Sequence, residues 1–343
     1  MTKRPFVRTK PRFLASSLIL TAAFMLSACG TGEQLEPTEA ETAYETGTLS
    51  MGTGEESALI HQAGIAIAGV INNTVPGIHV AVETTKGSMI NATNVSEGDL
   101  DLALISGDVA YDAVHGEFSF EGEPLDNLRV LGACYQEVSG WAALEKSGLS
   151  QVNELNGKII SSGSKASATE LASNVAYKYL GIDSSKTEIY YDSLSNSVEH
   201  IKRETADAVH AFAPVPYRAH EALAAEYDTV ILGYTDEELD AIVGSDARYF
   251  KTEIPAGTYP GQEDAVPTFG TKVLLCASAE MDEDLAYEIA RALDLNGPTY
   301  AGGHKFMAAM LDETFLCNDL PIRLHDGAEP YYRELGFLTD HTE

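Results

Sequence analysis

The sequence has little basic charge. Its 343 residues include 22 Lys and Arg against 52 Asp and Glu, which gives a formal net charge of −30. Nucleic-acid-binding proteins need a basic surface to neutralise phosphates, so this composition excludes that class of protein. Cysteine is also scarce, with four residues and no CxxC pair, and the nine histidines form no HxH or HExxH motif. We therefore expect neither a metal site nor a cofactor.

Recognisable catalytic motifs are missing as well. There is no GxSxG motif, and the glycines of MGTGEESA form neither GxGxxG nor a P-loop. Glu55 and Glu56 could act as an acid–base pair, but adjacent carboxylates at a helix start more often complement the helix dipole. His210 lies in the apolar run ADAVHAFA, where burial in packing is favoured over a place in a cleft. We therefore expect a binding protein rather than an enzyme.

The first 29 residues resemble a bacterial lipoprotein signal. Five basic residues precede an apolar run over 13–26, which is too short to span a bilayer comfortably and ends in Leu-Ser-Ala-Cys. We expect removal of residues 1–28, acylation of Cys29 and an extracytoplasmic protein anchored by lipid to the cell membrane. There are two alternatives. One is an ordinary signal peptide with an incidental cysteine, and the other is an uncleaved anchor helix. The polar, acidic stretch 29–43 predicts a flexible tether, and the mature charge would be about −35.

Apolar strands alternate with amphipathic helices through the rest of the chain, which predicts α/β architecture with parallel sheets covered on both faces. The chain leaves one such unit near 132–141, and FGTKVLLCAS is the natural return. We therefore expect a discontinuous lobe I, 44–137 plus 263–343, around an inserted lobe II, 138–262. Two crossing strands would join the lobes, and a ligand cleft would lie between their sheets. Two sequential domains with one linker are the alternative.

The run 128–145 is predicted to form a pair of strands, and the stretches 57–71 and 301–311 are predicted to form helices. Cysteines 134 and 276 lie in strand-like runs and are expected to be buried thiols, with one disulfide among Cys134, Cys276 and Cys317 left open.

Four predicted strand-to-helix junctions carry small hydroxyl or glycine residues. Helix N-termini bear partial positive charge, so such junctions can hold an anion without Lys or Arg. Each alone is more often an ordinary cap: Ser167 with Glu170 has capping-box spacing, and Asn196 with Glu199 is a weaker version of it. Lys165 could add one positive charge, with a solvated surface lysine as the alternative. If the junctions converge on one cleft, a small polar ligand fits there. The candidate ligand-binding residues are Thr53, Glu55, Ser57, Ser106, Gly107, Asp108, Ser167, Thr169, Asn196 and Phe212.

Four long segments, in the right order, resemble the TAXI family of solute receptors that serve TRAP-type transporters. They are VPGIHVAVETTKGSMINATNVSEGDLDLALISGDVAYDAVHG, NELNGKIISSGSKASATE, IPAGTYPGQEDAVPTFGTKVLLCASAEMDEDLAYEIARAL and NDLPIRLHDGAEPYYRELG. The resemblance covers roughly 48–337. It implies a two-lobed fold like that of type II periplasmic binding proteins, binding of glutamate or related dicarboxylates in the interlobe cleft, and docking to TRAP permease subunits. A lipoprotein that senses a ligand and signals to a membrane partner is the alternative function.

The cleft loops depart from the family pattern. Ile60 and His61 stand where the family has a tyrosine pair, Ser106 and Gly107 replace Gln-Asn, and the loop 165–169 replaces the family's proline and GSGT turn. Specificity resides in such loops, so the solute can differ from glutamate. Glu55 and Glu56 would suit a ligand that bears an amino group, or a bound cation. The stiff stretch IPAGTYPGQ is expected to be a structural turn, although its tyrosine, Tyr259, could reach the cleft edge.

Overall fold

The computed structural model describes residues 42–56, 58–165 and 167–338. The predicted signal peptide, Cys29 and nearly all of the predicted tether lie outside the described residues, as does Ser57. The described residues belong to one compact unit, Thr42–Glu343.

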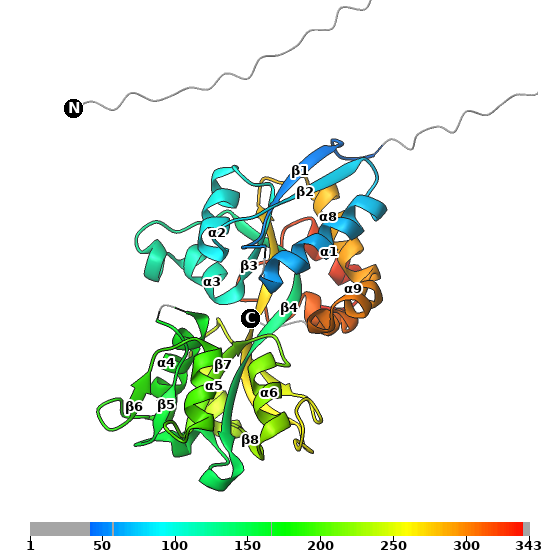
Figure 1. Ribbon diagram of the computed structural model, residues 1–343. Helices are drawn as coiled ribbons and strands as arrows, with labels where there is room; N and C mark the ends of the chain where they lie inside the picture. Colours follow the sequence, from blue (N-terminus) through cyan, green and yellow to red (C-terminus); the bar gives the residue numbers. More distant parts are fainter. Residues whose placement is uncertain (1–41, 57, 166, 339–343) are drawn as a thin grey trace, which may run out of the picture. The chain divides into compact units, whose positions relative to one another are not determined.

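Within the described residues, helices alternate with the strands of one mixed sheet (Figure 1). The strands are β1 Gly47–Gly52, β2 Ile78–Glu83, β3 Leu102–Ser106, β4 Leu128–Leu144, β5 Ile159–Ser161, β6 Glu188–Tyr190, β7 Ala208–Ala213, β8 Thr229–Leu232, β9 Phe250–Ile254 and β10 Val266–Ser278. The α-helices are α1 Leu59–Thr74, α2 Ser88–Glu97, α3 Gly107–His115, α4 Ala168–Leu180, α5 Leu194–Lys202, α6 Arg218–Glu226, α7 Asp236–Val243, α8 Glu283–Leu295, α9 Gly297–Gly303 and α10 Ala328–Glu334. Short 3-10 helices are η1 Phe118–Phe120, η2 Glu145–Ser147, η3 Val152–Leu155, η4 Lys305–Leu311 and η5 Glu313–Leu316.

The strand order is β2-β1-β3-β10-β4-β7-β5-β6, with β8 on β4 and β9 on β10. The outer pairs on each side are parallel, as expected for strands joined by helices. The two long central strands, β4 and β10, run antiparallel to their neighbours. Hydrogen bonding is therefore continuous across one mixed sheet, where the sequence predicted two separate sheets.

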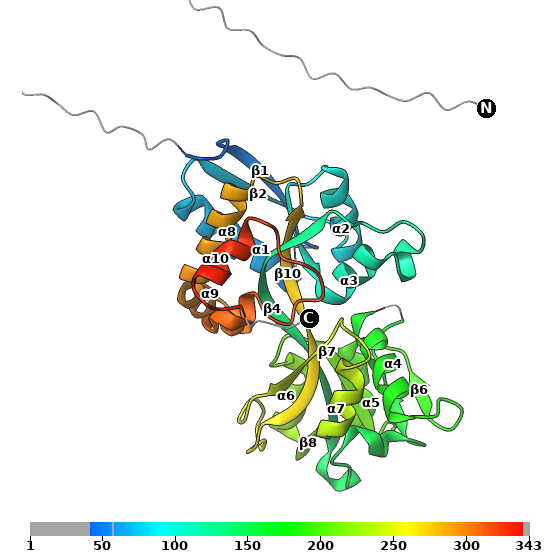
Figure 2. The same ribbon diagram turned by 180° about the vertical axis from the view of Figure 1, so that it is seen from behind.

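Strands β4 and β10 connect two lobes (Figures 1 and 2). Lobe I contains β1–β3, α1–α3 and α8–α10, and its hydrophobic core draws on residues between 44 and 135 and between 273 and 332. Lobe II contains β5–β9 and α4–α7, and two hydrophobic clusters between 138 and 269 fill it. The α/β class with two lobes and two crossing strands is thus as the sequence predicted. The boundaries 137/138 and 262/263 stay a prediction.

The predicted strand pair over 128–145 is wrong, because β4 is one strand of 17 residues. Gly140 does not turn the chain there but makes room for an aromatic ring. A Cβ atom at Gly140 would lie 2.3 Å from Cε2 of Tyr217. The hydroxyl of Tyr217 donates a hydrogen bond to the carbonyl of Val138 on the same strand.

Two of the predicted helices have different bounds. The first begins at Leu59 rather than 57, and its N-cap residue Ala58 makes no side-chain capping bond. The second is split, because α9 ends at Gly303 and a 3-10 helix, η4, replaces its continuation. His304 between them has the extended dihedrals φ −141° and ψ 104°, which end the α-helix.

The cysteines and the stiff stretch have structural roles. Cys134, Cys276 and Cys317 are free and buried, so the described cysteines form no disulfide. Tyr259 is buried away from any cleft edge, and its hydroxyl accepts a hydrogen bond of 3.0 Å from the backbone N–H of Tyr217. The side-chain amide of Gln262 donates to the carbonyls of Ile254 and Pro255 and ties the turn together. These contacts support the structural role predicted for this stretch.

Candidate functional site

The junction between β3 and α3 carries three of the predicted site residues. Ser106 ends the strand and Gly107 begins the helix. A Cβ atom at Gly107 would lie 2.7 Å from Oγ1 of Thr271 and 2.8 Å from the carbonyl oxygen of Lys272. Glycine therefore lets the start of α3 pack directly on the crossing strand β10. The next side chain, Asp108, is only 5% exposed and accepts a hydrogen bond of 2.8 Å from the N–H of Val109.

Glu137 lies beside this junction, on the crossing strand β4. The Ser106 hydroxyl donates to its Oε2 at 3.5 Å. Burial raises the pKa of Glu137 to about 8, and the nearby Asp108 carboxylate raises it further, against a smaller lowering by Ser106. Glu137 is therefore largely protonated at neutral pH. Sequence reasoning missed it, although an acid inside a long apolar strand was a usable signal.

Arg248 bridges the lobes. It lies before β9 in lobe II, and its Nε is 3.0 Å from Oδ1 of Asp112 on α3. Its Nη2 donates to Oε2 of Glu117 at 2.7 Å, and its Nε lies 3.5 Å from Oδ1 of Asp246. Burial raises the pKa of Asp112 to about 6, although the guanidinium of Arg248 lowers it. Nothing in the local sequence singles out Arg248, because its partners in lobe I, Asp112 and Glu117, are far from it along the chain.

Two aromatic rings complete the surroundings of this arginine. The guanidinium carbon lies 5.4 Å from the ring centre of Tyr111 and 4.8 Å from that of Phe118, both in lobe I. Such cation–π contacts add to the ion pairs. Arg248 is therefore held against lobe I by charge and by ring contacts together.

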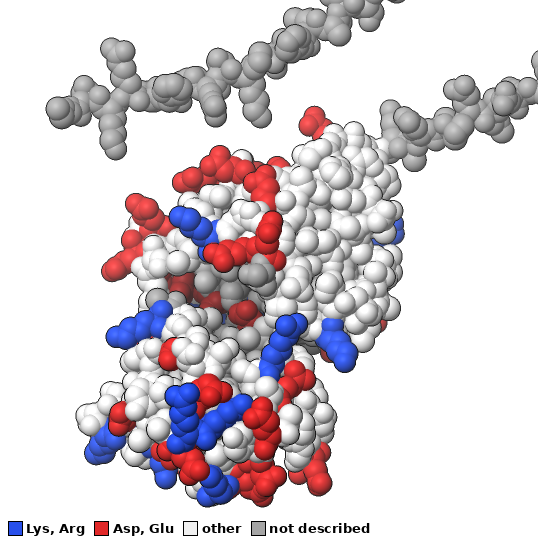
Figure 3. Space-filling view, viewed as in Figure 1, with Lys and Arg blue, Asp and Glu red and all other residues white. Residues whose placement is uncertain are grey.

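A cavity of about 470 Å³ lies between the lobes, beside Arg248. The surface is hollowed where the lobes meet, with acidic side chains around the hollow (Figure 3). Its walls are mostly apolar, with charged groups among them. It is lined by Met89, Asp108, Val109, Asp112, Phe118, Ser119, Phe120, Leu171, Asn174, Val175, Lys178, Tyr179, Asp246, Arg248 and Tyr249. A cavity of this size and lining suits a small organic molecule.

The start of α4 carries two of the lobe II residues predicted for the site, Ser167 and Thr169. The Ser167 side chain caps the helix by accepting a hydrogen bond of 3.2 Å from the N–H of Glu170, which confirms the predicted cap. The hydroxyl of Thr169 accepts from the N–H of Phe212 at 3.2 Å and so joins α4 to the end of β7. The Phe212 ring is buried and meets the ring of Tyr249, a cavity-lining residue, edge to face at 6.2 Å.

Of the predicted site residues that the structure describes, Asp108 alone lines the cavity, and the others lie outside its lining. Thr53 is fully buried, and its hydroxyl donates to the carbonyl of Glu83 at 2.8 Å and lies 2.9 Å from Nδ1 of His61. Thr53 therefore does not cap α1, whose N-cap residue is Ala58. Glu55 and Glu56 are exposed at the loop before α1.

The cap predicted at Asn196 is also wrong. Ser193, three residues earlier, caps α5 by accepting from the N–H of Asn196 at 3.4 Å. The exposed side chain of Asn196 donates instead to Asp192 at 2.9 Å. The run of polar residues before α5 offered two caps with similar spacing, and the earlier one is used.

His210 and Lys165 follow the simpler of their alternatives. His210 is buried, with Nε2 2.8 Å from the Ser139 hydroxyl and Nδ1 2.7 Å from the Ser173 hydroxyl, and Trp141 stacks on it at 4.3 Å. Burial lowers the pKa of His210 to about 3, so the ring is neutral and part of the packing. Lys165 is exposed and lies 4.9 Å from the ring centre of Tyr191.

Across residues 42–56, 58–165 and 167–338, no three His, Cys, Asp or Glu side chains are grouped so that they could hold a metal ion. Helices in the same part of the chain are all too short or too polar to cross a membrane.

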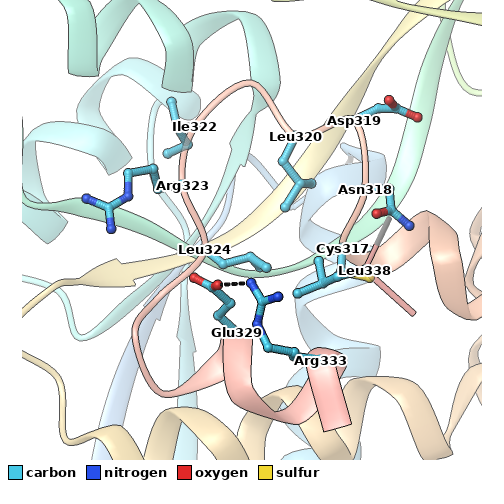
Figure 4. A pocket seen from close by; sticks show the side chains of 10 residues that line it. All are labelled: Cys317, Asn318, Asp319, Leu320, Ile322, Arg323, Leu324, Glu329, Arg333 and Leu338. Atoms are coloured by element: carbon cyan, nitrogen blue, oxygen red, sulfur yellow. Dashed lines mark hydrogen bonds and ion pairs between the residues drawn. The ribbon is translucent and has the colours of Figure 1, made fainter. Parts of the chain in front are cut away.

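A second cavity, of about 340 Å³, lies within the C-terminal segment (Figure 4). Glu329 and Arg333, one turn apart on α10, form an ion pair of 2.6 Å at its edge. It contains none of the predicted site residues. Its lining comes entirely from residues between 317 and 338, so it does not lie between the lobes.

Two α/β lobes joined by two long strands, with a cavity where they meet, define the fold of periplasmic binding proteins. The model of the NMT1-like family matches residues 51–336, and the chain belongs to this family.

Solved structures with similar folds share little sequence with this chain. A probable amino-acid ABC transporter extracellular-binding protein from Bacillus subtilis is 12% identical with a TM-score of 0.48, and the match covers 77% of this chain and 99% of that one. PhnD1 from Prochlorococcus marinus, in complex with methylphosphonate, is 10% identical with a TM-score of 0.48 and coverage of 85% and 99%. The aliphatic sulphonate binding protein SsuA from Escherichia coli is 12% identical with a TM-score of 0.44 and coverage of 84% and 87%.

Proposed function

We propose that this protein is an extracytoplasmic solute receptor, which binds a small organic molecule between its lobes and passes it to a membrane transporter unchanged. The observation that carries the proposal is the interlobe cavity of about 470 Å³, whose walls come from α3 and η1 on one side and from α4 and the residues before β9 on the other. A solute in this position contacts both lobes at once. It therefore stabilises the arrangement in which they are closed.

The contacts of Arg248 help to hold the two lobes in the closed arrangement. Its ion pairs with Asp112 and Glu117 join the lobes and exist only while the lobes are together. A solute shifts an open–closed equilibrium by its difference in affinity for the two states. Opening and closing would bend β4 and β10, the only strands that pass between the lobes within the described residues.

The resemblance to the TAXI family supports a narrower version of this proposal. In that version the transporter is of the TRAP type, its permease subunits are the partners, and the acylated Cys29 tethers the receptor to the membrane. The same resemblance suggests a glutamate-like amino acid or a dicarboxylate as the solute.

Native mass spectrometry of the purified protein tests the receptor proposal. We expect a small molecule to stay bound through gentle purification, to leave on denaturation and to be recovered chemically unchanged after long incubation. Conversion of the bound molecule would indicate an enzyme. If no molecule co-purifies and none stabilises the protein in a broad metabolite screen, the receptor proposal is wrong.

A further inference from the structure

Asp108 is a buried acid without a cationic partner. It is 95% buried, lines the interlobe cavity, and receives one hydrogen bond, from the adjacent N–H of Val109 to Oδ1. In the part of the chain that the structure describes, no Lys, Arg or His lies within ion-pair distance of its carboxylate. A buried carboxylate is costly unless it is paired or well hydrogen-bonded. The cavity therefore offers an acidic side chain with which a cationic ligand can pair.

A second acid, Glu137, lies near Asp108 but outside the lining of the cavity. Glu137 contacts Ser106, the residue that precedes Gly107 at the start of α3, through the hydroxyl contact of 3.5 Å. The other titratable groups that interact with Glu137 are Asp108, Tyr135 on its own strand and Tyr217 before α6. Burial raises the pKa of both tyrosines above its ordinary value, so neither ionises near neutral pH. Glu137 thus has no cationic neighbour among the groups that influence it.

The basic residues of the cavity are already engaged. Arg248 is shared among Asp112, Glu117 and Asp246. Lys178 is exposed at the rim, where its ammonium group donates to the Tyr179 hydroxyl at 3.1 Å. A dicarboxylate would therefore find acids in excess and no unengaged arginine. The net charge of −30 also attracts cations rather than anions toward the protein.

The cavity walls suit a carbon skeleton. Phe120, Leu171, Val175 and Tyr249 line it and come from both lobes. Phe120 and Tyr249 are almost fully buried, which limits their freedom to move aside. An apolar body would cover these walls while a charged end reached Asp108.

We propose that the solute is an organic cation, an amine carried on an apolar frame, whose ammonium group binds Asp108 and whose body lies along the apolar walls. This inference rests on the proposed receptor function and replaces the dicarboxylate that the family resemblance suggests. Binding of the ammonium group also changes the protonation of Glu137. An ammonium group bound to Asp108 offsets the negative charge that disfavours ionisation of Glu137, so binding near pH 7.5 releases a proton from Glu137.

Isothermal titration calorimetry of the purified full chain, stripped of bound solute, tests the inference. The probes are 2-phenylethylamine, glutarate, L-glutamate and calcium chloride. We expect 2-phenylethylamine to bind and the other three not to bind. In buffers with different enthalpies of ionisation at pH 7.5, its binding should release protons, and Glu137→Gln should abolish that release while binding persists.

Asp108→Asn provides the direct test of the contact. We expect it to weaken 2-phenylethylamine binding at least tenfold, whereas Asp99→Asn, at an exposed aspartate outside the cavity, leaves the affinity unchanged. Asp108 also lies in the first turn of α3, where an acid complements the helix dipole. A purely structural role would lower the melting temperature of Asp108→Asn without changing the affinity. The Glu137→Gln measurement remains informative if Asp108→Asn does not fold.

Several outcomes would overturn the inference and leave the receptor function standing. They are binding of glutarate or L-glutamate without binding of the amine, binding of calcium alone at Asp108, and amine binding unaffected by Asp108→Asn. Absence of amine binding also overturns it. If, in addition, nothing co-purifies with the protein and no metabolite stabilises it, the receptor function falls as well.

Discussion

At the scale of single residues, Glu137 makes stability depend on pH. Its pKa is about 8 in the folded chain against an ordinary 4.5, so between these values the folded state holds a proton that the unfolded chain releases. The free energy of unfolding therefore falls as pH rises through this window, by at most about 1.4 kcal/mol per pH unit from this group. We expect Glu137→Gln to flatten the fall and to raise stability at pH 8. Urea denaturation at pH 5, 6.5 and 8 measures this, and an unchanged slope in the variant would show that Glu137 is ionised when folded.

His220 has the opposite dependence on pH. It is fully buried among Tyr217 and Tyr259, and neither of its ring nitrogens has a hydrogen-bond partner in the described part of the chain. Burial lowers its pKa to about 3, so stability is lost as pH falls below the ordinary value of 6.5.

We therefore expect His220→Phe to match or exceed the parent in stability at pH 7 and to lose less on acidification to pH 5. Thermal denaturation at the two pH values measures this, with His79→Phe, at an exposed histidine, as the control. A loss above about 1 kcal/mol at pH 7 would mean that the ring nitrogens contribute a hydrogen bond after all.

At the scale of elements, the crossing strand β4 depends on a glycine. A Cβ atom at Gly140 would lie 2.3 Å from the ring of Tyr217, and that ring is buried and tied to Val138. We expect Gly140→Ala to destabilise the protein by about 1–3 kcal/mol through overpacking. Gly47→Ala in β1 is the matched control, because nothing lies within 4 Å of a Cβ atom there. Equal effects of the two substitutions on the urea midpoint would contradict this account of β4.

Local signals predicted the elements better than the contacts between them. The junction of β3 with α3 and the cap at Ser167 followed from short polar motifs next to apolar runs. Where two caps competed within a few residues, as at Ser193 and Asn196, spacing alone chose the wrong one. The run 128–145 was predicted as two strands, whereas Gly140 within the single strand β4 accommodates Tyr217, 77 residues away along the chain.

In the candidate site, contacts between distant residues were even harder to predict from local sequence signals. Asp108 was predicted because it directly follows a buried strand, but the ion pair of Arg248 with Glu117 joins residues separated by 131 positions. An acid inside a long apolar strand marks Glu137 in the sequence, but its neighbours Ser106 and Asp108 are brought beside it only by folding. Its raised pKa arises from burial, which a sequence pattern does not show. The sequence thus predicted the junction, whereas folding brought together the charges around it.

At the scale of the whole molecule, Arg248 controls how readily the lobes stay together. Arg248→Met removes the ion pairs with Asp112 and Glu117 and leaves both acids without their shared cation. We expect solute affinity to fall roughly tenfold, equivalent to about 1.4 kcal/mol, because closure becomes less favourable. Calorimetry with the co-purified solute measures the change. Arg203→Met, at an exposed arginine of α5's end, is the control, and equal affinities in both variants would exclude a role for Arg248 in closure.

Small-angle X-ray scattering on the solute-free protein, followed by titration with the solute that co-purifies, tests the central claim most directly. A receptor that closes around its solute should show a radius of gyration that decreases and saturates at one solute per chain, and Arg248→Met should need more solute to reach the same value. A radius of gyration that does not change while solute binds would contradict closure of the two lobes around the interlobe cavity.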